Sequence, residues 1–319
     1  MTSANGKRNE PFHRPVLVQE VVKFLVTRPD GIYVDLTCGG GGHLQRISQE
    51  LSPEALLVGV DRDEKAIETA QRNLESIPQR LQLSNIKFSA LEEMADRMKL
   101  NEVDGFLLDL GVSSYQIDTP ERGFSFIQDG PLDMRMGNSV LAGLTAEKIV
   151  NEYSAKELTV LLKKYGEERR ASLCAKAIVR GKEKEPIRST LQLVDILRPI
   201  LPLREFNSSL ARIFQALRIE VNDELHQLNE VLPQTLKSLR QGGRLVVISY
   251  HSLEDRIVKQ FMAEKAKGCI CPPRMPVCAC GRKPELKILT KKPVRPSGQE
   301  IESNIRARSA KLRAAEKIG

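Results

Sequence analysis

The sequence of 319 residues contains no tryptophan, and phenylalanine and tyrosine together make up only 4% of it. A surface that binds single-stranded nucleic acid by base stacking needs several exposed aromatic rings. The composition therefore gives little support to stacking as the means by which this chain would bind a nucleic acid. Hydrophobic residues (41%) and charged residues (28%) are present in the proportions of an ordinary globular protein, and one or two domains are expected.

Long apolar segments are also missing. No uninterrupted apolar run approaches the length of a membrane span, and residues 1–8 lack the apolar core of a signal peptide. The sequence therefore predicts a cytoplasmic protein without a membrane partner. Residues 1–14 are polar with glycine and proline, and they are predicted to be disordered.

Cysteine is scarce except in one place. Four of the six cysteines fall within twelve residues, in the pattern Cys269-x-Cys271-x₆-Cys278-x-Cys280. In a chain without an export signal, such clustering favours metal binding or redox chemistry over a disulfide framework. Four thiolates suit a structural zinc ion, and free or redox-active thiols are the alternative.

Positive charge is concentrated at the C-terminal end. The chain carries a net charge of +8, and residues 281–319 contain eleven basic and four acidic residues, a net charge of +7. A basic tail on a nearly neutral body suits a polyanion such as a nucleic acid. A solvated tail that only aids solubility is the alternative.

Apolar runs alternate with helical patterns in two parts of the chain, which predicts an α/β fold. An amphipathic helix is expected at 15–27. The predicted strands are residues 32–36, 55–60, 86–88, 103–110 and 244–249, and a last strand at 285–290 has no evident partner.

The alternation stops between residues 118 and 207, where helical spacing is present and no credible strand is found. We predict two domains. Residues 1–117 and 208–319 form one discontinuous α/β domain that ends in the basic tail 281–319, and residues 118–207 form a helical insertion.

The first predicted strand leads into a glycine-rich stretch. This stretch contains Asp35, then Gly39, Gly41, Gly42 and His43. Glycine allows close approach of a ligand to the backbone and accepts positive φ angles. No Gly-Lys-Ser/Thr sequence follows, so the lysine that holds phosphates in a P-loop is absent.

Carboxylates at the strand ends identify the ligand more closely. Asp35 precedes the glycines and could accept the ammonium group of an amino acid. Asp61 stands 19 residues after Gly42, at the end of the second strand, where nucleotide-binding α/β folds bind ribose hydroxyls. A ligand with an amino-acid part, a nucleoside part and no phosphate is S-adenosylmethionine. A methyltransferase is therefore favoured over an NAD-dependent enzyme.

Several longer motifs resemble one known family, the bacterial 16S ribosomal RNA (cytosine-N4) methyltransferases of the RsmH/MraW family. The resemblance covers nearly the whole chain. It implies a class I S-adenosylmethionine-dependent methyltransferase (Rossmann-like) sheet with an inserted all-helical domain. The motifs are Asp35-Leu36-Thr37-Cys38-Gly39-Gly40-Gly41-Gly42-His43, Asp109-Leu110-Gly111-Val112-Ser113-Ser114, Glu121-Arg122-Gly123-Phe124-Ser125-Phe126, Asp129-Gly130-Pro131-Leu132-Asp133-Met134-Arg135-Met136, Tyr165-Gly166-Glu167-Glu168-Arg169, Ser249-Tyr250-His251-Ser252-Leu253-Glu254-Asp255-Arg256 and Ala307-Arg308-Ser309-Ala310-Lys311-Leu312-Arg313.

The resemblance also implies the residues that contact the cofactor. Four of these residues also have a purely structural alternative. His43 could cap a helix, Phe88 could be a core residue, and Asp61 or Asp109 could be an ordinary carboxylate at a strand end. The implied contacts, taken with those argued from the glycine loop, are Asp35, Gly39, Gly41, Gly42, His43, Asp61, Phe88, Asp109 and Gln116.

The implied reaction is methyl transfer to the exocyclic N4 of a cytidine in the decoding region of 16S ribosomal RNA. The lone pair of this amine is delocalised into the ring, so an acceptor for its N–H groups is needed. Asp109 is the candidate acceptor, with Ser113 as a helper. His251 is a second candidate for handling the proton, and a role in capping or bracing the loop is its alternative.

The implied partner is 16S ribosomal RNA or the small ribosomal subunit. The helical insertion and the basic tail are expected to contact the RNA, with Arg122, Arg135, Arg169 and Arg170 as candidate phosphate contacts. A surface salt bridge is the alternative role of each of these arginines. A non-catalytic RNA-binding assembly factor that keeps the cofactor fold is the alternative function. The sequence leaves the oligomeric state open, with a homodimer as one option.

Overall fold

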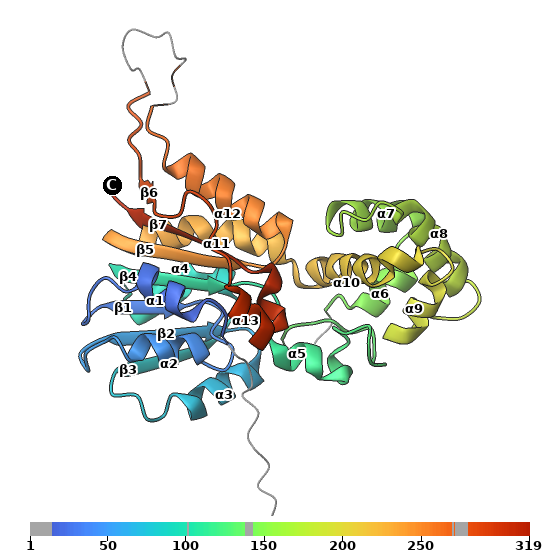
Figure 1. Ribbon diagram of the computed structural model, residues 1–319, viewed down its shortest axis with the longest axis horizontal. Coiled ribbons are helices and arrows are strands. Elements are labelled where there is room, and N and C mark those ends of the chain that lie inside the picture. Colours follow the sequence, from blue (N-terminus) through green and yellow to red (C-terminus); the bar gives the residue numbers. More distant parts are fainter. Residues whose placement is uncertain (1–14, 101, 138–142, 270, 272–279) are drawn as a thin grey trace, which may run out of the picture.

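The computed structural model describes residues 15–100, 102–137, 143–269, 271 and 280–319, so the segment 1–14 predicted to be disordered lies outside the described residues. A seven-stranded sheet forms one part of the molecule, and a group of helices forms a second part beside it (Figure 1). The strands are β1 (Ile32–Asp35), β2 (Leu56–Asp61), β3 (Arg80–Asn85), β4 (Val103–Asp109), β5 (Leu239–Ser249), β6 (Leu286–Ile288) and β7 (Lys311–Lys317).

The order of the strands identifies the fold. Across the sheet the order is β3-β2-β1-β4-β5-β7-β6, and β7 runs antiparallel to both of its neighbours. Strands β1 to β5 pair in parallel. This order, with β7 inserted antiparallel beside β5, is that of the predicted class I methyltransferase sheet.

Helices cover both faces of the sheet because its central strands are apolar on both sides. One face packs against α4 (Leu91–Met98), α11 (Glu224–Ser238) and α12 (Ser252–Lys265). The other face packs against α1 (Val18–Leu25), α2 (Gly42–Ser48) and α3 (Glu64–Asn73). The sheet is therefore the middle layer of three.

The second part of the molecule has its own apolar core, as the helical spacing predicted. The buried apolar residues of this core lie between Leu132 and Leu217 and form one cluster. This cluster is separate from the apolar clusters on the two faces of the sheet. Ser154 and Glu157 form the predicted capping box. The helices are α6 (Ala146–Glu152), α7 (Ala155–Lys164), α8 (Ala171–Lys182), α9 (Thr190–Leu197) and α10 (Phe206–Asn222).

Helix α10 crosses the predicted boundary between residues 207 and 208. Leu210, Ile213 and Leu217 of this helix are buried in the core of the helical part. The helix ends at Asn222. Asp223, whose φ angle of 52° is left-handed, follows it, and α11 starts at Glu224. We therefore place the end of the insertion at Asn222. This boundary could not be predicted from the sequence, because composition does not change along one continuous helix.

Two strands differ from their predicted positions. The third strand is β3 rather than 86–88, because it is a half-exposed edge strand whose apolar side chains, Leu81 and Leu83, alternate with polar ones. Phe88 instead begins a short 3₁₀ helix, η1 (Phe88–Ala90). The fifth strand starts at Leu239, five residues before the predicted start, and passes through Gly242 with a φ angle of 79°.

The basic segment 281–319 is not a free tail. It supplies β6 and β7, and Leu312, Ala314 and Ala315 are buried in the sheet. The unplaced strand predicted at 285–290 therefore has β7 as its partner. Strand β7 reads Lys-Leu-Arg-Ala-Ala-Glu-Lys, which contains no β-branched or aromatic residue, and this is why the sequence did not reveal it.

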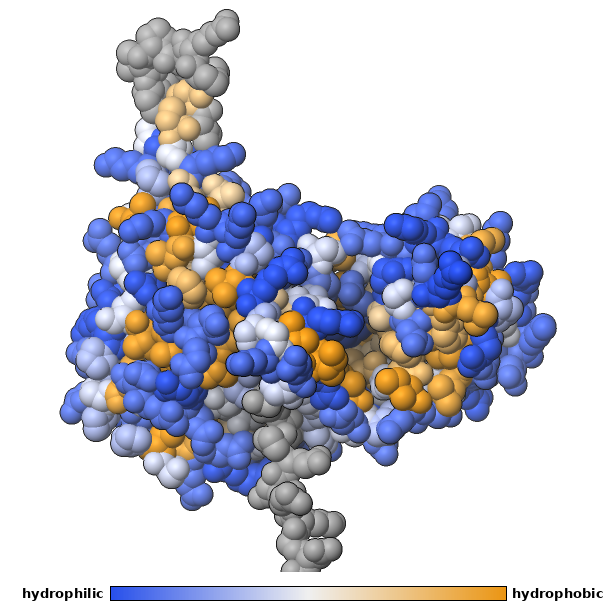
Figure 2. Space-filling model, viewed as in Figure 1, coloured by the Kyte–Doolittle hydropathy of each residue, from blue (hydrophilic) through white to orange (hydrophobic). Residues whose placement is uncertain are grey.

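Hydrophilic side chains cover most of the surface visible in Figure 2, with apolar residues scattered among them. In the part of the chain that the structure describes, no helix is both long enough and apolar enough to cross a membrane.

Candidate active site

A cleft opens at the carboxyl ends of β1, β2, β4 and β5, where the sheet meets the helical part. Parallel α/β sheets bind their ligands at this edge. The cleft and the solvent at its open mouth together occupy about 1050 Å³, and the walls include Thr37, Asp61, Asp109 and Tyr250 from the four strand ends. Asn222 and Met136 close it on the side of the helical part.

The glycine loop forms one wall of the cleft. Gly39, Gly42 and His43 line it, whereas Gly41 does not. Gly41 is the N-cap of α2 with a φ angle of 84°, and a Cβ added there would lie 2.8 Å from a methyl carbon of Leu74. Glycine is therefore required at position 41 by the backbone conformation and by the close approach of Leu74. Because Gly41 does not line the cleft, the structure does not support it as a ligand contact.

Asp61 ends β2 and holds the loop in place. Its Oδ2 accepts a hydrogen bond of 2.9 Å from the Gly39 N–H, and its Oδ1 accepts one of 2.8 Å from the Asp63 N–H. Burial raises the pKa of Asp61 to about 6, although these backbone bonds oppose the rise. The carboxylate also lines the cleft, where it can accept hydrogen bonds from a ligand.

Asp35 carries an unsatisfied oxygen. The side chain is 1% exposed, and Oδ1 accepts a 3.0 Å hydrogen bond from the Thr37 N–H. Oδ2 is buried and has no hydrogen-bond partner among the described residues. Burial raises the pKa of Asp35 to about 7, even though the nearby His43 lowers it. A cationic ligand group beside this oxygen would relieve the cost of burying the charge.

Asp109 is held at both carboxylate oxygens. The Tyr250 hydroxyl donates to Oδ1 across 2.9 Å, and His43 Nε2 lies 3.3 Å from Oδ2. The Asp109 N–H donates to the Thr37 hydroxyl oxygen, which fixes the backbone as well. Three polar side chains that are distant in the sequence thus meet at the cleft.

Both side chains that contact Asp109, those of His43 and Tyr250, have a raised pKa. Burial lowers the pKa of His43, but the hydrogen bond and charge of Asp109, with the charge of Asp35, outweigh burial and raise it overall. Burial, followed by the charge of Asp109, raises the pKa of Tyr250 well above its usual value. The hydroxyl therefore keeps its proton and acts as a donor to Asp109 at neutral pH.

Ser113 and Gln116 line the cleft but are occupied with local structure. They form a reciprocal capping box at the start of α5 (Ser114–Asp118): Ser113 Oγ accepts from the Gln116 N–H, and Gln116 Oε1 accepts from the Ser113 N–H. The Gln116 amide nitrogen also donates to Asp63 at 3.2 Å. Both residues are near a ligand in the cleft, and their evident role is to fix its wall.

His251 does not line the cleft, so the structure does not support it as a second proton acceptor. The side chain is the N-cap of α12, where Nδ1 accepts a hydrogen bond of 3.4 Å from the Glu254 N–H. Nε2 lies 3.1 Å from Glu254 Oε1, without the angle of a hydrogen bond. His251 therefore caps α12, which is the alternative role that the sequence left open. The neighbouring residue, Tyr250, is the one that contacts Asp109.

Phe88 reaches the cleft from η1 rather than from a strand. Its half-buried ring packs against the apolar cluster that contains Leu110 and Leu228, which also line the cleft. These three side chains form an apolar wall next to the carboxylate of Asp61. The wall suits the flat face of a purine.

Arg122 does not face solvent as a phosphate contact, so that prediction was wrong. Its guanidinium pairs with Asp63 at 2.9 Å and donates to the backbone carbonyl groups of Arg135 and Met136. The amide of Asn222 binds the same segment, accepting from the Met136 N–H at 2.9 Å. Arg122 thus joins the helical part to the sheet.

The other arginines in that prediction have different surroundings. Arg135 pairs with Asp133 at 2.6 Å, and the exposed Arg170 donates to the carbonyl group of Ile200. Arg169 is exposed. Arg169 and Arg170 are therefore still available to an RNA backbone.

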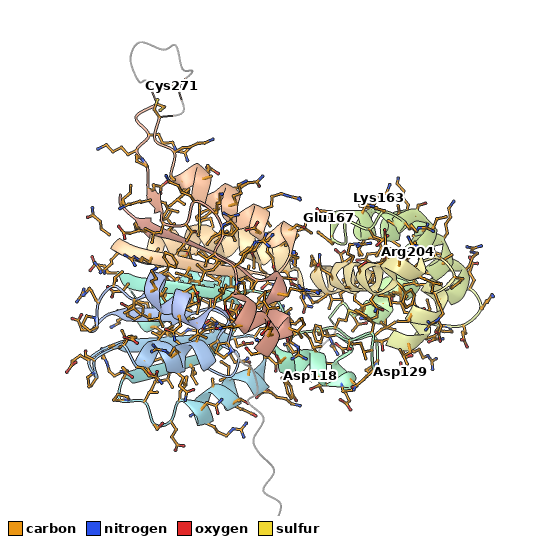
Figure 3. All side chains as sticks on the ribbon, viewed as in Figure 1. Asp118, Asp129, Lys163, Glu167, Arg204 and Cys271 are labelled. Carbon is orange, nitrogen blue, oxygen red and sulfur yellow. The ribbon has the colours of Figure 1, made fainter. Side chains whose placement is uncertain are left out.

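Further contacts join the two parts on the α12 side. Glu167, labelled in Figure 3 between them, accepts a hydrogen bond of 2.6 Å from the Ser252 hydroxyl and pairs with Arg256 at 3.0 Å. Glu167 itself has a left-handed φ angle of 50°. The helical part is thereby held against the sheet by side chains on both flanks of α10.

Several residues of the cleft were not predicted from the sequence, among them four polar ones. Tyr250 was noticed only as part of a motif, and Asn222, Glu224 and Gln227 were not singled out. Both carboxylate oxygens of Glu224 accept hydrogen bonds from Arg218, and the buried Oε1 of Gln227 has no hydrogen-bond partner among the described residues. Asn222, Glu224 and Gln227 lie where α10 meets α11, fifteen or more residues beyond the predicted domain boundary.

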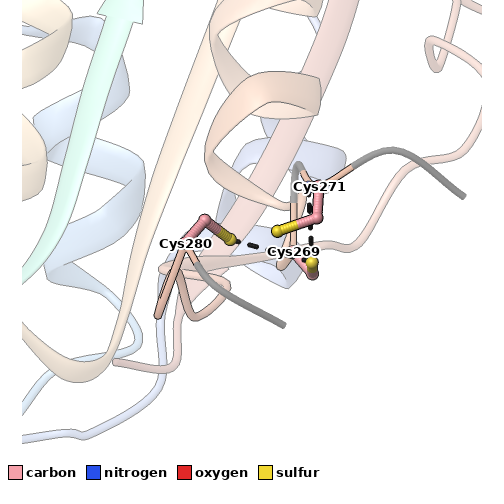
Figure 4. A group of neighbouring side chains, drawn as sticks. All are labelled: Cys269, Cys271 and Cys280. Atoms are coloured by element: carbon pink, nitrogen blue, oxygen red, sulfur yellow. Dashed lines mark hydrogen bonds between the residues drawn. The ribbon is translucent and has the colours of Figure 1, made fainter. Parts of the chain in front are cut away.

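Three of the four clustered cysteines lie together beyond the C-terminal end of α12. The sulfur atoms of Cys269, Cys271 and Cys280 lie within 4.8 Å of one another, and those of Cys269 and Cys280 are 3.7 Å apart (Figure 4). Cys278, the fourth predicted ligand, lies outside the described residues.

The chain is similar to known proteins over nearly its whole length. The model of the MraW methylase family matches residues 10–318. The chain is 49% identical to "Ribosomal RNA small subunit methyltransferase H" of Caldicellulosiruptor saccharolyticus over 307 residues, covering 96% of this chain and 99% of the relative. The protein of the same name from Geobacter sulfurreducens is 49% identical over 309 residues, with the same coverage. A solved structure titled as a putative rRNA-methylase from Clostridium thermocellum aligns over 94% of this chain, with a TM-score of 0.43 and 11% identity. The match over nearly the whole chain shows that it belongs to the MraW methylase family.

Proposed function

We propose that the chain methylates the exocyclic N4 of a cytidine in the decoding region of 16S ribosomal RNA, with S-adenosylmethionine as methyl donor. Relatives named as ribosomal RNA small subunit methyltransferases, 49% identical over 96% of the chain, support the substrate class. The observation that carries the proposal is Asp109, a carboxylate fixed at both oxygens in a cleft beside a glycine loop.

The residues of the cleft fit S-adenosylmethionine. The Asp61 carboxylate suits ribose hydroxyls, and the apolar wall around Phe88 suits adenine. Asp35 does not itself line the cleft, but it directly precedes Leu36 and Thr37, which do, and its buried, unsatisfied Oδ2 would suit an ammonium group. The loop has no lysine to hold phosphates. When bound, the cofactor supplies a methyl group on a positively charged sulfur.

We assign the handling of the substrate amine to Asp109. The lone pair of N4 is delocalised into the pyrimidine ring, and a carboxylate that accepts one of its N–H bonds returns electron density to the nitrogen. The nitrogen loses one proton as it gains a methyl group, and Asp109 accepts that proton. Tyr250 and His43 hold the carboxylate in one orientation, so little reorganisation is needed during the reaction.

A non-catalytic assembly factor is the competing function. Such a protein would have no need of a carboxylate that is held by two side chains, His43 and Tyr250, at the mouth of the cleft. Methyl incorporation into small subunits from cells that lack this protein distinguishes a methyltransferase from an assembly factor. We expect transfer by the wild-type protein and a loss of at least 100-fold for Asp109→Ala, with mass mapping placing the product at one cytidine.

Calorimetry with S-adenosylmethionine and with NAD accompanies that assay. Asp109→Ala with full turnover would contradict the assignment of the acceptor, and binding of NAD instead of S-adenosylmethionine would contradict the proposed reaction. A wild-type protein that binds the cofactor and RNA but transfers no methyl group would favour the assembly factor. The isosteric Asp109→Asn separates loss of charge from loss of shape.

We also propose that the helical part, which includes α6 to α10, recognises the RNA. It faces the mouth of the cleft, and exposed basic residues such as Lys163 and Arg204 lie on its surface (Figure 3). Because Arg122 fixes this part against the sheet, the RNA would meet a wall already in position. Weaker RNA binding by Lys163→Gln/Arg204→Gln, without weaker cofactor binding, is the expected result.

Finally, we propose that Cys269, Cys271 and Cys280 bind zinc as thiolates. Their sulfur atoms lie close enough together to share one ion, and each thiol releases its proton to solvent on binding. The sequence offers Cys278 as the fourth ligand. Metal analysis of purified protein should find one zinc per chain, and Cys269→Ser/Cys280→Ser should find none. A metal-free wild-type protein purified without chelators would contradict the site.

A further inference from the structure

The cysteines stand at the end of a projecting segment that the proposed reaction does not use. We call it the cysteine arm, defined as residues 266–269, 271 and 280–285. Figure 1 shows it leaving the sheet part beyond the end of α12, and Figure 3 labels Cys271 on it, far from the helical part. Helix α12 has 14 residues, so the arm starts about 20 Å from the cleft.

The base of the arm is closed by specific contacts. The Glu285 N–H donates to the Lys265 carbonyl group at 2.8 Å, and the Lys265 ammonium pairs with the Glu285 carboxylate at 2.9 Å. Arg282 donates to the carbonyl group of Glu264 at 3.1 Å and pairs with its side chain. The two ends of the arm are therefore joined at the sheet, and the thiolates would join them again further out.

Exposed basic side chains lie on the arm and on the strand that follows it. Lys267 and Lys283 on the arm and Lys287 on β6 are exposed. The nearby acidic side chains Glu264 and Glu285 are already paired with Arg282 and Lys265. Among the residues that the structure describes, the exposed basic side chains without an ion pair in this region are Lys267, Lys283, Lys287, Lys291, Lys292 and Arg295.

We propose that the cysteine arm, held in shape by a metal ion on its thiolates, is a second RNA-binding site that contacts phosphates about 20 Å from the cleft. This inference rests on the proposed function, because it takes ribosomal RNA as the substrate. Lysines that contact phosphates bind through charge and release counterions, so they add affinity without selecting a base. The arm is too distant from the cleft to contact the reacting amine. It extends the footprint of the protein on a large RNA.

The test compares three forms of the full-length protein with wild type. Lys267→Gln/Lys283→Gln removes charge from the arm, Cys269→Ser/Cys280→Ser removes its metal ligands, and Lys23→Gln/Lys99→Gln is a control that removes two exposed lysines elsewhere. Binding of a 16S ribosomal RNA transcript is measured between 50 and 200 mM salt, the range over which phosphate contacts lose roughly 10³- to 10⁵-fold in affinity when they are many. Methyl transfer is measured at saturating RNA.

We expect the lysine variant to bind RNA roughly tenfold more weakly, with a salt slope smaller by about 1.5, because each phosphate contact contributes about 0.7 to 0.9. Its kcat should equal that of wild type and its KM for RNA should rise. The cysteine variant should lose zinc and several-fold in RNA affinity, and the control should match wild type.

Unchanged RNA affinity and salt slope in the lysine variant would overturn the inference, and the proposed function would stand if methyl transfer were intact. Loss of zinc without loss of RNA affinity would overturn the part played by the metal. A lower kcat at saturating RNA in the lysine variant would also overturn the inference, because it would place the arm in the chemistry. Wild-type protein that transfers no methyl group to small subunits would overturn the proposed function itself.

Discussion

The Tyr250 hydroxyl donates a hydrogen bond of 2.9 Å to Oδ1 of Asp109, and the two residues come from the ends of adjacent strands. Ile248 lies beside Asp109 in the parallel pairing of β4 with β5, so the residues that follow Ile248 reach the cleft next to Asp109. The contact is therefore a direct product of sheet register. It leaves Asp109 with one hydrogen-bond donor on each carboxylate oxygen.

Removal of the Tyr250 hydroxyl tests its role. Tyr250→Phe should lower kcat about tenfold, because a hydrogen bond to a charged group contributes about 1.5–3 kcal/mol and this one orients the acceptor. The rate of methyl transfer under saturating conditions measures the effect.

Tyr153 offers a matched control for this experiment. Its hydroxyl also donates to a carboxylate at 2.9 Å, that of Glu220, but outside the cleft. Tyr153→Phe should leave kcat unchanged. An equal loss of rate in both variants would mean that Tyr250 acts through general stability and not through Asp109.

Asp35 makes the stability of the ligand-free protein depend on pH. Its pKa is raised to about 7 in the folded state from an ordinary value of 3.8, so the folded state keeps a proton that the unfolded state loses between about pH 4 and pH 7. Stability therefore falls across that window as the pH rises. At pH 8 we expect Asp35→Asn to unfold at a higher temperature than wild type and to bind S-adenosylmethionine more weakly.

Asp104 provides the contrast to Asp35. It is also buried, but its carboxylate accepts from the Ile32 N–H at 2.8 Å and pairs with Arg240. Asp104→Asn should therefore lower the melting temperature. If Asp35→Asn lowered it as well, the unsatisfied oxygen would not be a source of instability, and its role as the ammonium site would lose its physical basis.

The ion pair of Arg122 with Asp63 should hold the helical part against the sheet. Arg122→Ala leaves Asp63 buried without its charge partner, and breaking a buried pair in this way costs about 3–5 kcal/mol. Urea unfolding should show the loss. Arg198→Ala breaks an exposed pair with Asp195 on α9 and should cost less than about 1 kcal/mol. Similar small losses in both variants would contradict the importance of this junction.

The C-terminal strand should be essential for folding, in contrast to a basic tail. A chain that ends at Ala310 lacks β7, which pairs with β5 over Arg244–Ser249 and buries Leu312 and Ala314. We expect aggregation or loss of the cooperative unfolding transition. Lys291→Gln/Lys292→Gln, which removes charge from the same segment, should unfold like wild type. A stable, folded truncated chain would contradict this prediction.

The sequence predicted the parts of the fold whose pattern is local. The apolar runs of β1, β2 and β4 and the capping box at Ser154 can be recognised within ten residues. Strand β7 could not, because it is stabilised by insertion between two strands that are distant in sequence. The end of the insertion was also hidden, because Leu217 and Asn222 belong to one helix but to different surroundings.

In the candidate site, too, the residues that follow a local sequence pattern were predicted, whereas those that depend on tertiary contacts were not. Asp35, Asp61 and Asp109 were predicted because each ends a recognisable strand, and the structure gathers Asp61 and Asp109 in one cleft with Asp35 nearby. The misassigned residues are those whose environment depends on tertiary contacts. Arg122 has a buried carboxylate as its partner, and His251 is taken up by a helix cap, neither of which spacing could reveal.

Helix α10 connects the core of the helical part to the cleft. Its middle belongs to the core of the helical part, while its last residue, Asn222, lines the cleft and binds the segment that Arg122 also holds. Under the proposed function, a displacement of the helical part by RNA would move a wall of the cofactor cleft. The affinities for RNA and for the cofactor would then be thermodynamically linked, and a substitution that changes one of them would change the other.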